Sequence, residues 1–308
     1  MRKTLILSLV LSMFSLPTTV LADDSTSRKA VLVTGASSGI GLKVAQKLAA
    51  NGFYVYAGAR KAEDLKRLDA MENVSSVRLD VTVQEEIDKA VDFVKKQGRG
   101  LWGLVNNAGV AFYAPLVDGP ESDLMLTMEV NVIGPYRVNR AFLPLLMESK
   151  GRTTVISSIS AFIPGRSGSY SMSKSAVEAY TDTLANELAG SGVHVSAVQP
   201  GAFKSRIVEK LKDRALSHAA EGTMDLDEET RASLKKSAAA REAMKEPDAV
   251  AEAVLSLMTS DEPQRRYMVT PNEEQAHLTI RSAMQRLLEL NAGQPYAYDR
   301  DGLVELLD

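Results

Sequence analysis

Seven short, apolar, β-prone runs alternate with helical patterns along most of the chain, and this alternation constrains the fold more than any other feature. The runs are 30–34, 53–57, 76–79, 101–106, 153–157, 194–198 and 267–269. Several are almost continuously apolar, which is typical of strands buried on both faces of a parallel sheet. Helical patterns occupy 40–51, 61–70, 84–97, 121–149, 170–190 and 248–259. We therefore predict an α/β fold: a doubly wound, mostly parallel, seven-stranded sheet flanked by helices.

The alternation continues without a break that would separate domains. The chain has 308 residues, and no internal repeat or low-complexity linker divides it. We therefore interpret residues 23–308 as one domain. Residues 204–246 interrupt the rhythm, because they carry many charges, amphipathic positions and no strand run. Their place after a late strand predicts a helical insertion that forms a lid over a site at the carboxyl ends of the strands.

The composition argues against two classes of function. A formal net charge of −3 gives the chain no overall basic excess of the kind that nucleic-acid-binding proteins carry. The chain has no cysteine and only three histidines, without metal-ligand spacing, so we expect no metal site.

The first 22 residues differ from the rest. Two basic residues precede an apolar run over 5–16, and small residues then lead to Ala22. A charged start, a short apolar core and a small-residue exit are typical of a secretory signal peptide. The run is short for a membrane span, but an uncleaved N-terminal anchor is the alternative. The segment therefore predicts an exported, periplasmic or membrane-associated protein, or a cytoplasmic one if the segment is not functional.

A glycine-rich segment, TGASSGIG (34–41), follows the first strand directly and opens into a helix. Glycines allow a tight turn, close approach of the backbone to a ligand, and close packing of helix on strand. The unpaired N–H groups and the dipole at the start of the helix suit a phosphate. We therefore predict a dinucleotide site at this turn. Its contacting residues would be Gly35, Ser37, Ser38, Gly39, Ile40 and Gly41.

The exit of the second strand bears on which dinucleotide binds. An acid there commonly holds the ribose 2′-hydroxyl of NAD, whereas an arginine accepts the 2′-phosphate of NADP. This chain has Ala59 and Arg60, and no acid before Glu63. A planar guanidinium can pair with a phosphate dianion, which a carboxylate would repel. The sequence favours NADP over NAD, and the alternative is an Arg60 that only faces solvent.

A tyrosine and a lysine four residues apart, Tyr170 and Lys174, lie in the helical segment YSMSK. Residues at i and i+4 share one face of a helix. A nearby ammonium favours the phenolate, which makes a tyrosine usable as a proton donor and acceptor. The pair alone does not decide between this chemistry and a surface aromatic beside a surface cation.

Together with NNAG (106–109), the segments TGASSGIG and YSMSK resemble, in order and spacing, the short-chain dehydrogenase/reductase family over about residues 30–205. The resemblance implies that Tyr170 is the catalytic tyrosine and Lys174 its partner. The catalytic serine of the family lies thirteen positions before the tyrosine, which points to Ser157, with Ser158 as the alternative. Asn131 resembles the helix asparagine that supports a water-linked proton relay.

The same resemblance implies further contacts to the cofactor. The acid after the third strand matches the adenine edge, the NNAG turn beginning at Asn106 matches the adenine-side wall, and PGAFKS matches the segment beside the nicotinamide. The cofactor-contacting residues so implied are Asp80, Val81, Asn107, Ala108, Gly109, Tyr170, Lys174, Pro200, Gly201 and Ser205. Ser205 stands where threonine is common, and it keeps the hydroxyl.

The implied chemistry is hydride transfer between NADP(H) and a secondary alcohol, ketone or aldehyde. Tyr170 would exchange the proton with the substrate oxygen, and Ser157 would donate a hydrogen bond to that oxygen. Lys174 would hold the nicotinamide ribose and lower the pKa of the tyrosine. The alternatives are the same chemistry with NAD(H), a catalytically silent NADP-binding redox sensor, and a sugar-nucleotide epimerase or dehydratase, whose members share Tyr-x-x-x-Lys.

Apolar residues near these motifs predict a hydrophobic substrate such as a steroid, a retinoid or another lipid. They are Phe112, Tyr113, Phe162, Ile163 and Phe203, and core packing is the alternative for each. The chain also looks similar to the steroid and retinol branch of the family.

The family commonly forms homodimers or homotetramers through the tyrosine-bearing helix and the helix before it. In this chain those helices are predicted over 121–149 and 170–190. Val177, Tyr180, Leu184 and Leu188 form an apolar stripe on the second of them, which suits either an interface or the core.

Overall fold

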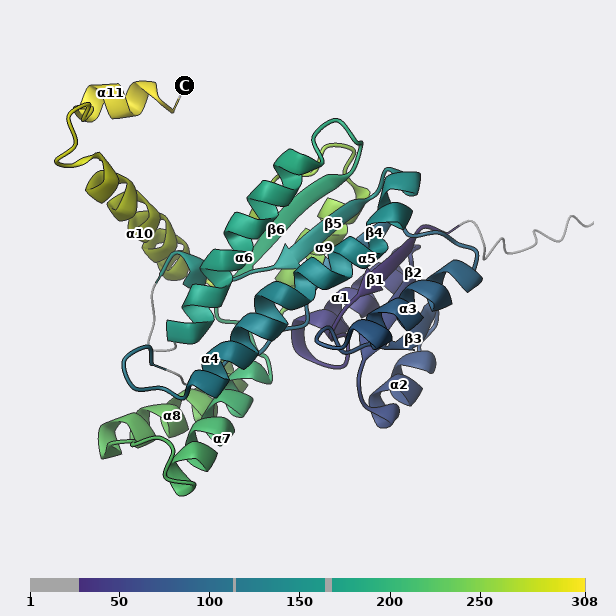
Figure 1. The fold of residues 1–308 in the computed structure, drawn as a ribbon, viewed down its shortest axis with the longest axis horizontal. Coiled ribbons are helices and arrows are strands. Elements are labelled where there is room, and N and C mark those ends of the chain that lie inside the picture. The colour runs from purple at the N-terminus through teal and green to yellow at the C-terminus, as the bar shows by residue number, and fades with distance from the viewer. Residues whose placement is uncertain (1–27, 113–114, 164–167, 308) are drawn as a thin grey trace, which may run out of the picture.

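Seven parallel strands form one sheet in the order β3–β2–β1–β4–β5–β6–β7 (Figure 1). The computed structural model describes residues 28–112, 115–163 and 168–307. The strands are β1 (Ala30–Val33), β2 (Tyr54–Ala59), β3 (Val74–Arg78), β4 (Gly103–Asn106), β5 (Arg152–Ile156), β6 (His194–Pro200) and β7 (Arg266–Val269). Each overlaps a run predicted from the sequence, and every neighbouring pair is parallel. The predicted Rossmann-type α/β fold is confirmed.

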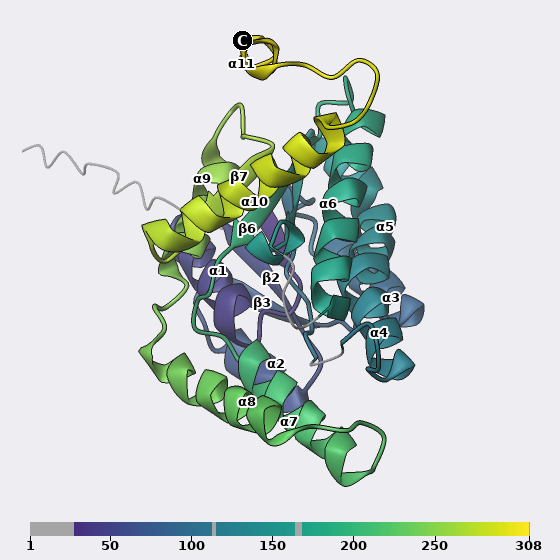
Figure 2. The same ribbon diagram turned by 90° about the vertical axis from the view of Figure 1, so that its left-hand side faces the viewer.

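The two faces of the sheet are covered by different helices. Alternate residues of a strand point to opposite faces, so Val31 and Val33 join one apolar cluster, and Ala30 and Leu32 join the other. The first cluster includes residues of α1 (Gly39–Ala50) and α9 (Asp248–Thr259). The second includes residues of α3 (Gln84–Lys96), α5 (Gly134–Ser149) and α6 (Gly168–Glu187). Figure 2 shows these two layers on opposite sides of the sheet.

The strand order reverses at β1, because β2 and β3 lie on one side of it and β4 to β7 on the other. In open α/β sheets, ligands bind in the crevice at the carboxyl ends of the strands where this reversal occurs. The segments after β1 and β4 meet at that point, since the backbone N–H of Thr34 donates to the carbonyl of Val105 at 3.0 Å. The fold therefore brings the glycine-rich turn and the NNAG turn side by side.

Residues 121–149, predicted as one helix, form three consecutive parts. These are α4 (Glu121–Met128), a π-helical turn (Glu129–Ile133) and α5. A π-helical turn holds an extra residue within an otherwise α-helical run, and such turns are frequent at functional sites. The turn contains the buried Asn131. Hydrophobic spacing does not reveal this break, because the apolar pattern resumes directly after it.

The predicted insertion at 204–246 is helical. It contains α7 (Ile207–Ala220), α8 (Glu228–Ala240) and a 3-10 turn (Arg241–Ala243). Ala215, Met224, Leu226 and Leu234 form a small apolar cluster of their own within it. In Figure 1, α7 and α8 lie below α4 at one end of the molecule.

The remaining helical elements include α2 (Ala62–Asp69) at the β3 edge of the sheet and α10 (Glu273–Asn291), which contacts the segments after β5 and β6. α2 packs beside β3, and a 3-10 turn (Ile159–Ala161) follows β5. α10 is the last long helix, and α11 (Arg300–Glu305) projects beyond it (Figure 2). The predicted signal peptide or anchor, residues 1–22, lies outside the described residues. Within the described part of the chain, no helix is both long and apolar enough to cross a bilayer.

The apolar stripe on α6 faces the core rather than solvent. Val177 is fully buried, and Leu184 and Leu188 pack into the cluster shared with α3 and α5. The hydroxyl of Tyr180 accepts a hydrogen bond from the side-chain amide of Asn139 at 3.0 Å. The stripe therefore follows its core alternative and gives no support to the predicted homodimer or homotetramer.

Candidate active site

A cavity of about 410 Å³ lies at the carboxyl ends of the strands. It is lined by residues that follow strands β1 to β6 and by the first turn of α7. Every residue predicted to contact a cofactor lines it except Gly41. Among the predicted catalytic residues, Ser157, Tyr170 and Lys174 line it, and Asn131 does not. The structure thus brings these residues together, and their individual roles stay predictions.

Two glycines of the turn after β1 are required by packing, and a third lies open to the cavity. Gly35 has φ +65°, and a Cβ added there would lie 2.9 Å from the Cα of Ala108. A Cβ on Gly41 would collide with the Gly35 carbonyl and the Asn107 side chain. Gly39 has φ +56°, but its added Cβ would meet only Ser205, at 3.5 Å. At Gly39 the left-handed backbone conformation, rather than close packing, therefore favours glycine.

The NNAG turn is fastened to the glycine-rich turn through Thr34. The buried hydroxyl of Thr34 accepts hydrogen bonds from the backbone N–H groups of Asn107 and Ala108, both at 3.0 Å. In return, the side-chain amide of Asn107 donates to the carbonyls of Thr34, at 2.9 Å, and Gly35, at 3.1 Å. Asn106 points away into the core, where its amide donates to Asn139 and Thr153. This network fixes the cavity wall between β1 and β4.

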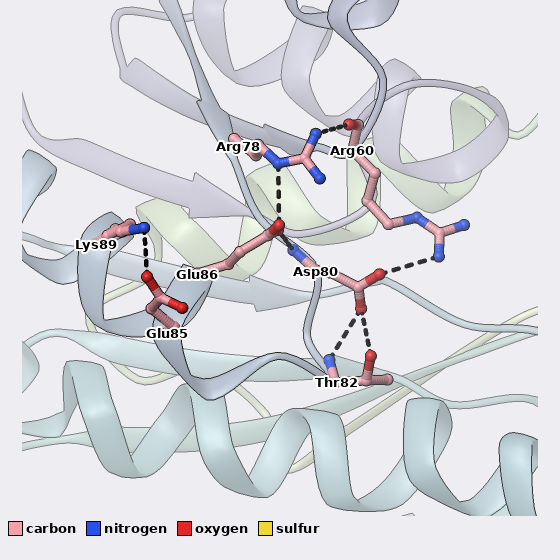
Figure 3. A network of polar contacts seen from close by, with 7 residues as sticks. All are labelled: Arg60, Arg78, Asp80, Thr82, Glu85, Glu86 and Lys89. Carbon is pink, nitrogen blue, oxygen red and sulfur yellow. Dashed lines mark hydrogen bonds and ion pairs between the residues drawn. The ribbon is translucent and has the colours of Figure 1, made fainter.

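Arg60 and Asp80 form an ion pair at the end of the cavity beside β2 and β3 (Figure 3). Nη1 of Arg60 lies 3.2 Å from Oδ2 of Asp80, and the arginine side chain is 61% exposed. Burial alone would raise the pKa of Asp80, but hydrogen bonds from Thr82 and Arg60 outweigh it, so the pKa is lowered. Exposed ion pairs contribute only about 0–1 kcal/mol. A phosphate can therefore compete with Asp80 for Arg60 at small cost.

The backbone around this ion pair is held by a second one. Arg78 donates through Nε to Glu86 at 2.9 Å and through Nη1 to the carbonyl of Arg60 at 2.6 Å. The other oxygen of Glu86 accepts from the backbone N–H of Asp80 at 2.8 Å. Figure 3 shows Arg78 and Glu86 linking the backbone of Arg60 to that of Asp80. The exits of β2 and β3 are therefore fixed relative to each other.

Tyr170 and Lys174 lie at the other end of the cavity, on the first turns of α6. Nζ of Lys174 donates to the carbonyl of Ile156 at 2.8 Å and lies 5.5 Å from the centre of the Tyr170 ring. Burial lowers the pKa of Lys174 to about 8, against the opposing charge of Glu178. Burial likewise raises the pKa of Tyr170. The expected lowering of the tyrosine pKa by Lys174 is therefore not found, because desolvation of the phenol dominates.

The hydroxyl that reaches Tyr170 belongs to Ser158. The side chains of Ser158 and Tyr170 are hydrogen-bonded, which partly offsets the raised tyrosine pKa. Ser157 also lines the cavity, but its Oγ is buried and has no hydrogen-bond partner among the described residues. Successive side chains at a strand end point to opposite sides, so a count that errs by one residue selects the wrong hydroxyl. The geometry favours Ser158, the stated alternative, over Ser157.

Asn131 is buried in the π-helical turn and joins two walls of the site. Its Oδ1 accepts from the backbone N–H of Val110 at 2.8 Å, and its Nδ2 donates to the Val110 carbonyl at 2.9 Å. Nδ2 also lies 3.0 Å from Oγ of Ser173, which is adjacent to Lys174. Asn131 therefore ties the segment after the NNAG turn to the helix that carries the tyrosine. The predicted proton relay through Asn131 stays a prediction.

The sequence predicted that the insertion covers the site, but apart from Ser205 it did not identify which residues of the insertion line the cavity. Arg206, Ile207 and Lys210 at the start of α7 line it, and so does Met244 after the 3-10 turn. Among the apolar residues predicted to contact substrate, Phe203 lines this cavity and is buried. Phe112, Phe162 and Ile163 do not line it, and Tyr113 lies outside the described residues. Position after a strand could have indicated Arg206, but nothing in the sequence places Lys210.

The insertion is fastened to α4 by a buried carboxylate. Asp123 is fully buried, and Nε of Arg214 donates to its Oδ1 at 3.0 Å. Its Oδ2 lies 3.0 Å from Nε2 of the buried His218, whose Nδ1 lies 2.8 Å from the hydroxyl of Thr223. A buried carboxylate requires such partners, because an unpaired one would be strongly destabilising. These contacts hold α7 in its place at the mouth of the cavity.

Within the described residues, no group of three or more acidic or histidine side chains is arranged to hold a metal ion. The polar side chains that line the cavity are mostly hydroxyls and cations, with the amide of Asn107 and the carboxylate of Asp80, which is paired with Arg60. Such groups suit the phosphates and hydroxyls of a dinucleotide. The open side of Gly39 fits a site shaped for a bound group, because an added Cβ there would meet only Ser205.

Residues 29–215 match the family model for short chain dehydrogenases, which is more than half of the chain. The chain belongs to the short-chain dehydrogenase family. Curated relatives of this short-chain dehydrogenase are named as a reductase and as dehydrogenases.

Three curated relatives show sequence similarity to this short-chain dehydrogenase. It is 40% identical over 187 residues to the 3-amino-tetrahydro-pyrrolizinone reductase of Xenorhabdus hominickii, which is 60% of this chain and 65% of that protein. It is 34% identical over 247 residues to the uncharacterized oxidoreductase YbbO of Escherichia coli strain K12, covering 79% and 86%. It is 38% identical over 208 residues to estradiol 17-beta-dehydrogenase 2 of Rattus norvegicus, covering 62% and 54%. The match thus spans less than two thirds of the first and third relatives.

The fold of this short-chain dehydrogenase also matches solved structures. A short-chain dehydrogenase from Streptomyces avermitilis is similar with a TM-score of 0.70 and 26% sequence identity, covering 88% of this chain and 99% of that one.

Proposed function

We propose that this protein transfers hydride between NADP(H) and a hydrophobic ketone or secondary alcohol. One observation carries the proposal: a single cavity joins Arg60 at one end to Tyr170, Lys174 and Ser158 at the other. The bound nicotinamide cofactor supplies the hydride. The protein supplies a phosphate site, an acid–base group and a hydrogen-bond donor for the substrate oxygen.

Tyr170 acts as the proton donor in the reducing direction. Its raised pKa keeps the phenol protonated at neutral pH, which is the form that can protonate a developing alkoxide. Ser158, whose hydroxyl is hydrogen-bonded to that of Tyr170, donates to the substrate oxygen instead once substrate is bound. Lys174 holds the ribose hydroxyls and supplies positive charge beside the phenol. Asn131 positions α6 through Ser173 rather than touching the ligand.

Substituting the two neighbouring serines separately tests whether Ser158 is the donor, as proposed here, or Ser157, as the thirteen-residue spacing to Tyr170 implies. We expect Ser158→Ala to lower kcat about a hundredfold, because it removes a donor to the oxyanion. Ser157→Ala should change kcat less than about threefold, since its buried hydroxyl bonds no described group. Both variants are compared at pH 7 on one substrate, with nucleotide affinity measured in parallel. A larger loss in Ser157→Ala than in Ser158→Ala would contradict the assignment.

The substrate is proposed to be apolar. The cavity near Tyr170 is lined by Val110, Ile159 and Phe203, and the insertion adds Ile207 and Met244. Apolar walls with a few placed polar groups are typical of sites for hydrophobic small molecules. One relative is named for estradiol and another for a pyrrolizinone, which supports a cyclic ketone or alcohol. A steroid-like or other lipid-like substrate fits both the walls and the first of these names.

We also propose assembly into homodimers or homotetramers, as in the family, through α4, α5 and α6. Large apolar side chains on these helices remain exposed, namely Met125, Leu126, Ile133, Tyr136, Met147 and Met172. Export or membrane attachment through residues 1–22 is a further proposal that rests on the sequence alone.

The preference for NADP(H) is tested by titrating NADPH and NADH separately into residues 23–308, following nicotinamide fluorescence. We expect tighter binding of NADPH. Arg60→Ala should raise the Kd for NADPH about tenfold and leave that for NADH nearly unchanged, because charge-assisted hydrogen bonds to the 2′-phosphate are lost.

Lys66→Ala is the matched control, since Lys66 is an exposed cation on α2 and does not line the cavity. Tighter binding of NADH would overturn the choice of cofactor and leave the catalytic proposal standing. Failure of both nucleotides to bind at micromolar concentrations would count against the enzyme function. The silent-sensor alternative predicts binding without turnover of any ketone or alcohol.

A further inference from the structure

The first turn of α7 places two cations in the cavity, opposite the exit of β2. Arg206 precedes the helix and Lys210 lies one turn into it, and both line the same cavity as Arg60. Lys210 and Arg60 are far apart in the sequence and come from the insertion and the sheet, respectively. The two side chains line the same cavity from different elements. A ligand at the Arg60 end therefore meets the insertion as well as the sheet.

This end of the cavity is positively charged. Partial burial lowers the pKa of Lys210, and the positive charges of Arg206, Arg60 and Lys61 lower it further, against an opposing contribution from Asp64. The described residues offer Arg206 and Lys210 no ion pair of their own, although the side chain of Glu209 is not described. Asp64 is already bonded to Arg67, and Asp80 to Arg60. Like charges held this close favour the binding of an anion.

The geometry and charge specify the kind of anion. A guanidinium binds phosphate through its planar fork, and a lysine ammonium adds a compact point charge. The exit of β2 is where the 2′-position of the adenine ribose lies in this fold. An acidic substrate would instead lie near Tyr170, at the opposite end of the cavity. A phosphate dianion on the adenine ribose therefore suits this end better than a substrate carboxylate does.

We propose that Lys210 contacts the 2′-phosphate of NADP(H) together with Arg60, so that the insertion itself recognises the phosphate. This inference rests on the proposed function. It makes Lys210 a specificity-determining residue and links the position of α7 to the identity of the cofactor. NADPH, but not NADH, would draw the first turn of α7 toward the exit of β2.

The test uses Lys210→Ala in residues 23–308, with Lys212→Ala as the matched control. Lys212 lies on the same helix, pairs with Asp213 and does not line the cavity. We expect Lys210→Ala to raise the Kd for NADPH about tenfold and to leave the Kd for NADH within about twofold. Adenosine 2′-monophosphate should lose affinity in parallel, whereas adenosine 5′-monophosphate should not. Lys210→Arg should restore most of the preference.

A second readout follows the insertion directly. NADPH should protect residues 205–244 from limited proteolysis more than NADH does in the unmodified protein, and Lys210→Ala should remove that difference. The inference is overturned if Lys210→Ala leaves the NADPH affinity unchanged, or weakens both nucleotides equally, while Arg60→Ala still abolishes the preference. If the unmodified protein binds neither nucleotide, the proposed function fails and the inference fails with it.

Discussion

Tyr170→Phe is expected to lower kcat for ketone reduction about a thousandfold and to leave the Kd for NADPH within about twofold. The variant lacks the hydroxyl that donates the proton, and general acid–base catalysis contributes about 10²–10⁴-fold. The ring remains, so the wall of the cavity keeps its shape. The measurement is single-substrate kinetics on whichever cyclic ketone of a panel the unmodified protein reduces fastest, with nucleotide binding followed by fluorescence.

Tyr180→Phe is the matched control for this prediction. Tyr180 lies on the same helix and also loses a hydrogen bond, from Asn139, but it does not line the cavity. Its kcat should stay close to that of the unmodified protein. Full activity in Tyr170→Phe would show that Tyr170 is not the proton donor. A parallel loss of nucleotide affinity would instead indicate a structural role.

Lys174→Met is expected to abolish measurable turnover and, at the same time, to stabilise the folded protein at pH 7. Lys174 is 5% exposed, and burial lowers its pKa from the ordinary 10.5 to about 8. That gap corresponds to about 3 kcal/mol spent on keeping the buried ammonium charged at pH 7. Methionine removes this cost and also the hydrogen bond to the Ile156 carbonyl, worth about 1 kcal/mol. The free energy of unfolding should therefore rise by about 2 kcal/mol.

The stability gain in Lys174→Met should depend on pH in a definite direction. Between pH 8 and pH 10.5 the unfolded chain binds the lysine proton and the folded chain does not. Stability from this group therefore rises with pH across that window and is constant below it. The gain in Lys174→Met should shrink from pH 7 to pH 9.5 in denaturant unfolding, whereas Lys66→Met should show no such trend. A variant less stable than the unmodified protein at pH 7 would contradict the cost assigned to the buried charge.

Much of the fold and the motif-based part of the site could be predicted because their signals are local. Strands buried on both faces are apolar throughout, as in β1, and a glycine such as Gly35 reports a backbone conformation that its neighbours impose. Tyr170 and Lys174 share a helix face, so their spacing already placed them together. These features depend on a few adjacent residues, and the sequence displays them directly.

Other parts of the site depend on contacts between distant segments, and the sequence does not display those. The choice between Ser157 and Ser158 depends on which way the chain turns after β5. Lys210 looks like any exposed lysine until α7 is placed beside the exit of β2. The raised pKa of Tyr170 follows from burial, which the spacing to Lys174 does not report. In each case the missing information is the tertiary structure around the residue.

The two ends of the insertion meet between the end of β6 and the start of α9. The backbone N–H of Lys204 donates to the carbonyl of Lys245 at 2.9 Å, and Lys204 also pairs with Glu242 and Glu246. Between them, α7 and α8 carry their own apolar cluster. A segment whose ends are already closed adds little chain-closure entropy when its length changes. We therefore expect this insertion to tolerate changes in its length and in the residues that line the cavity. Such changes would leave β6, α9 and the hydride-transfer groups in place.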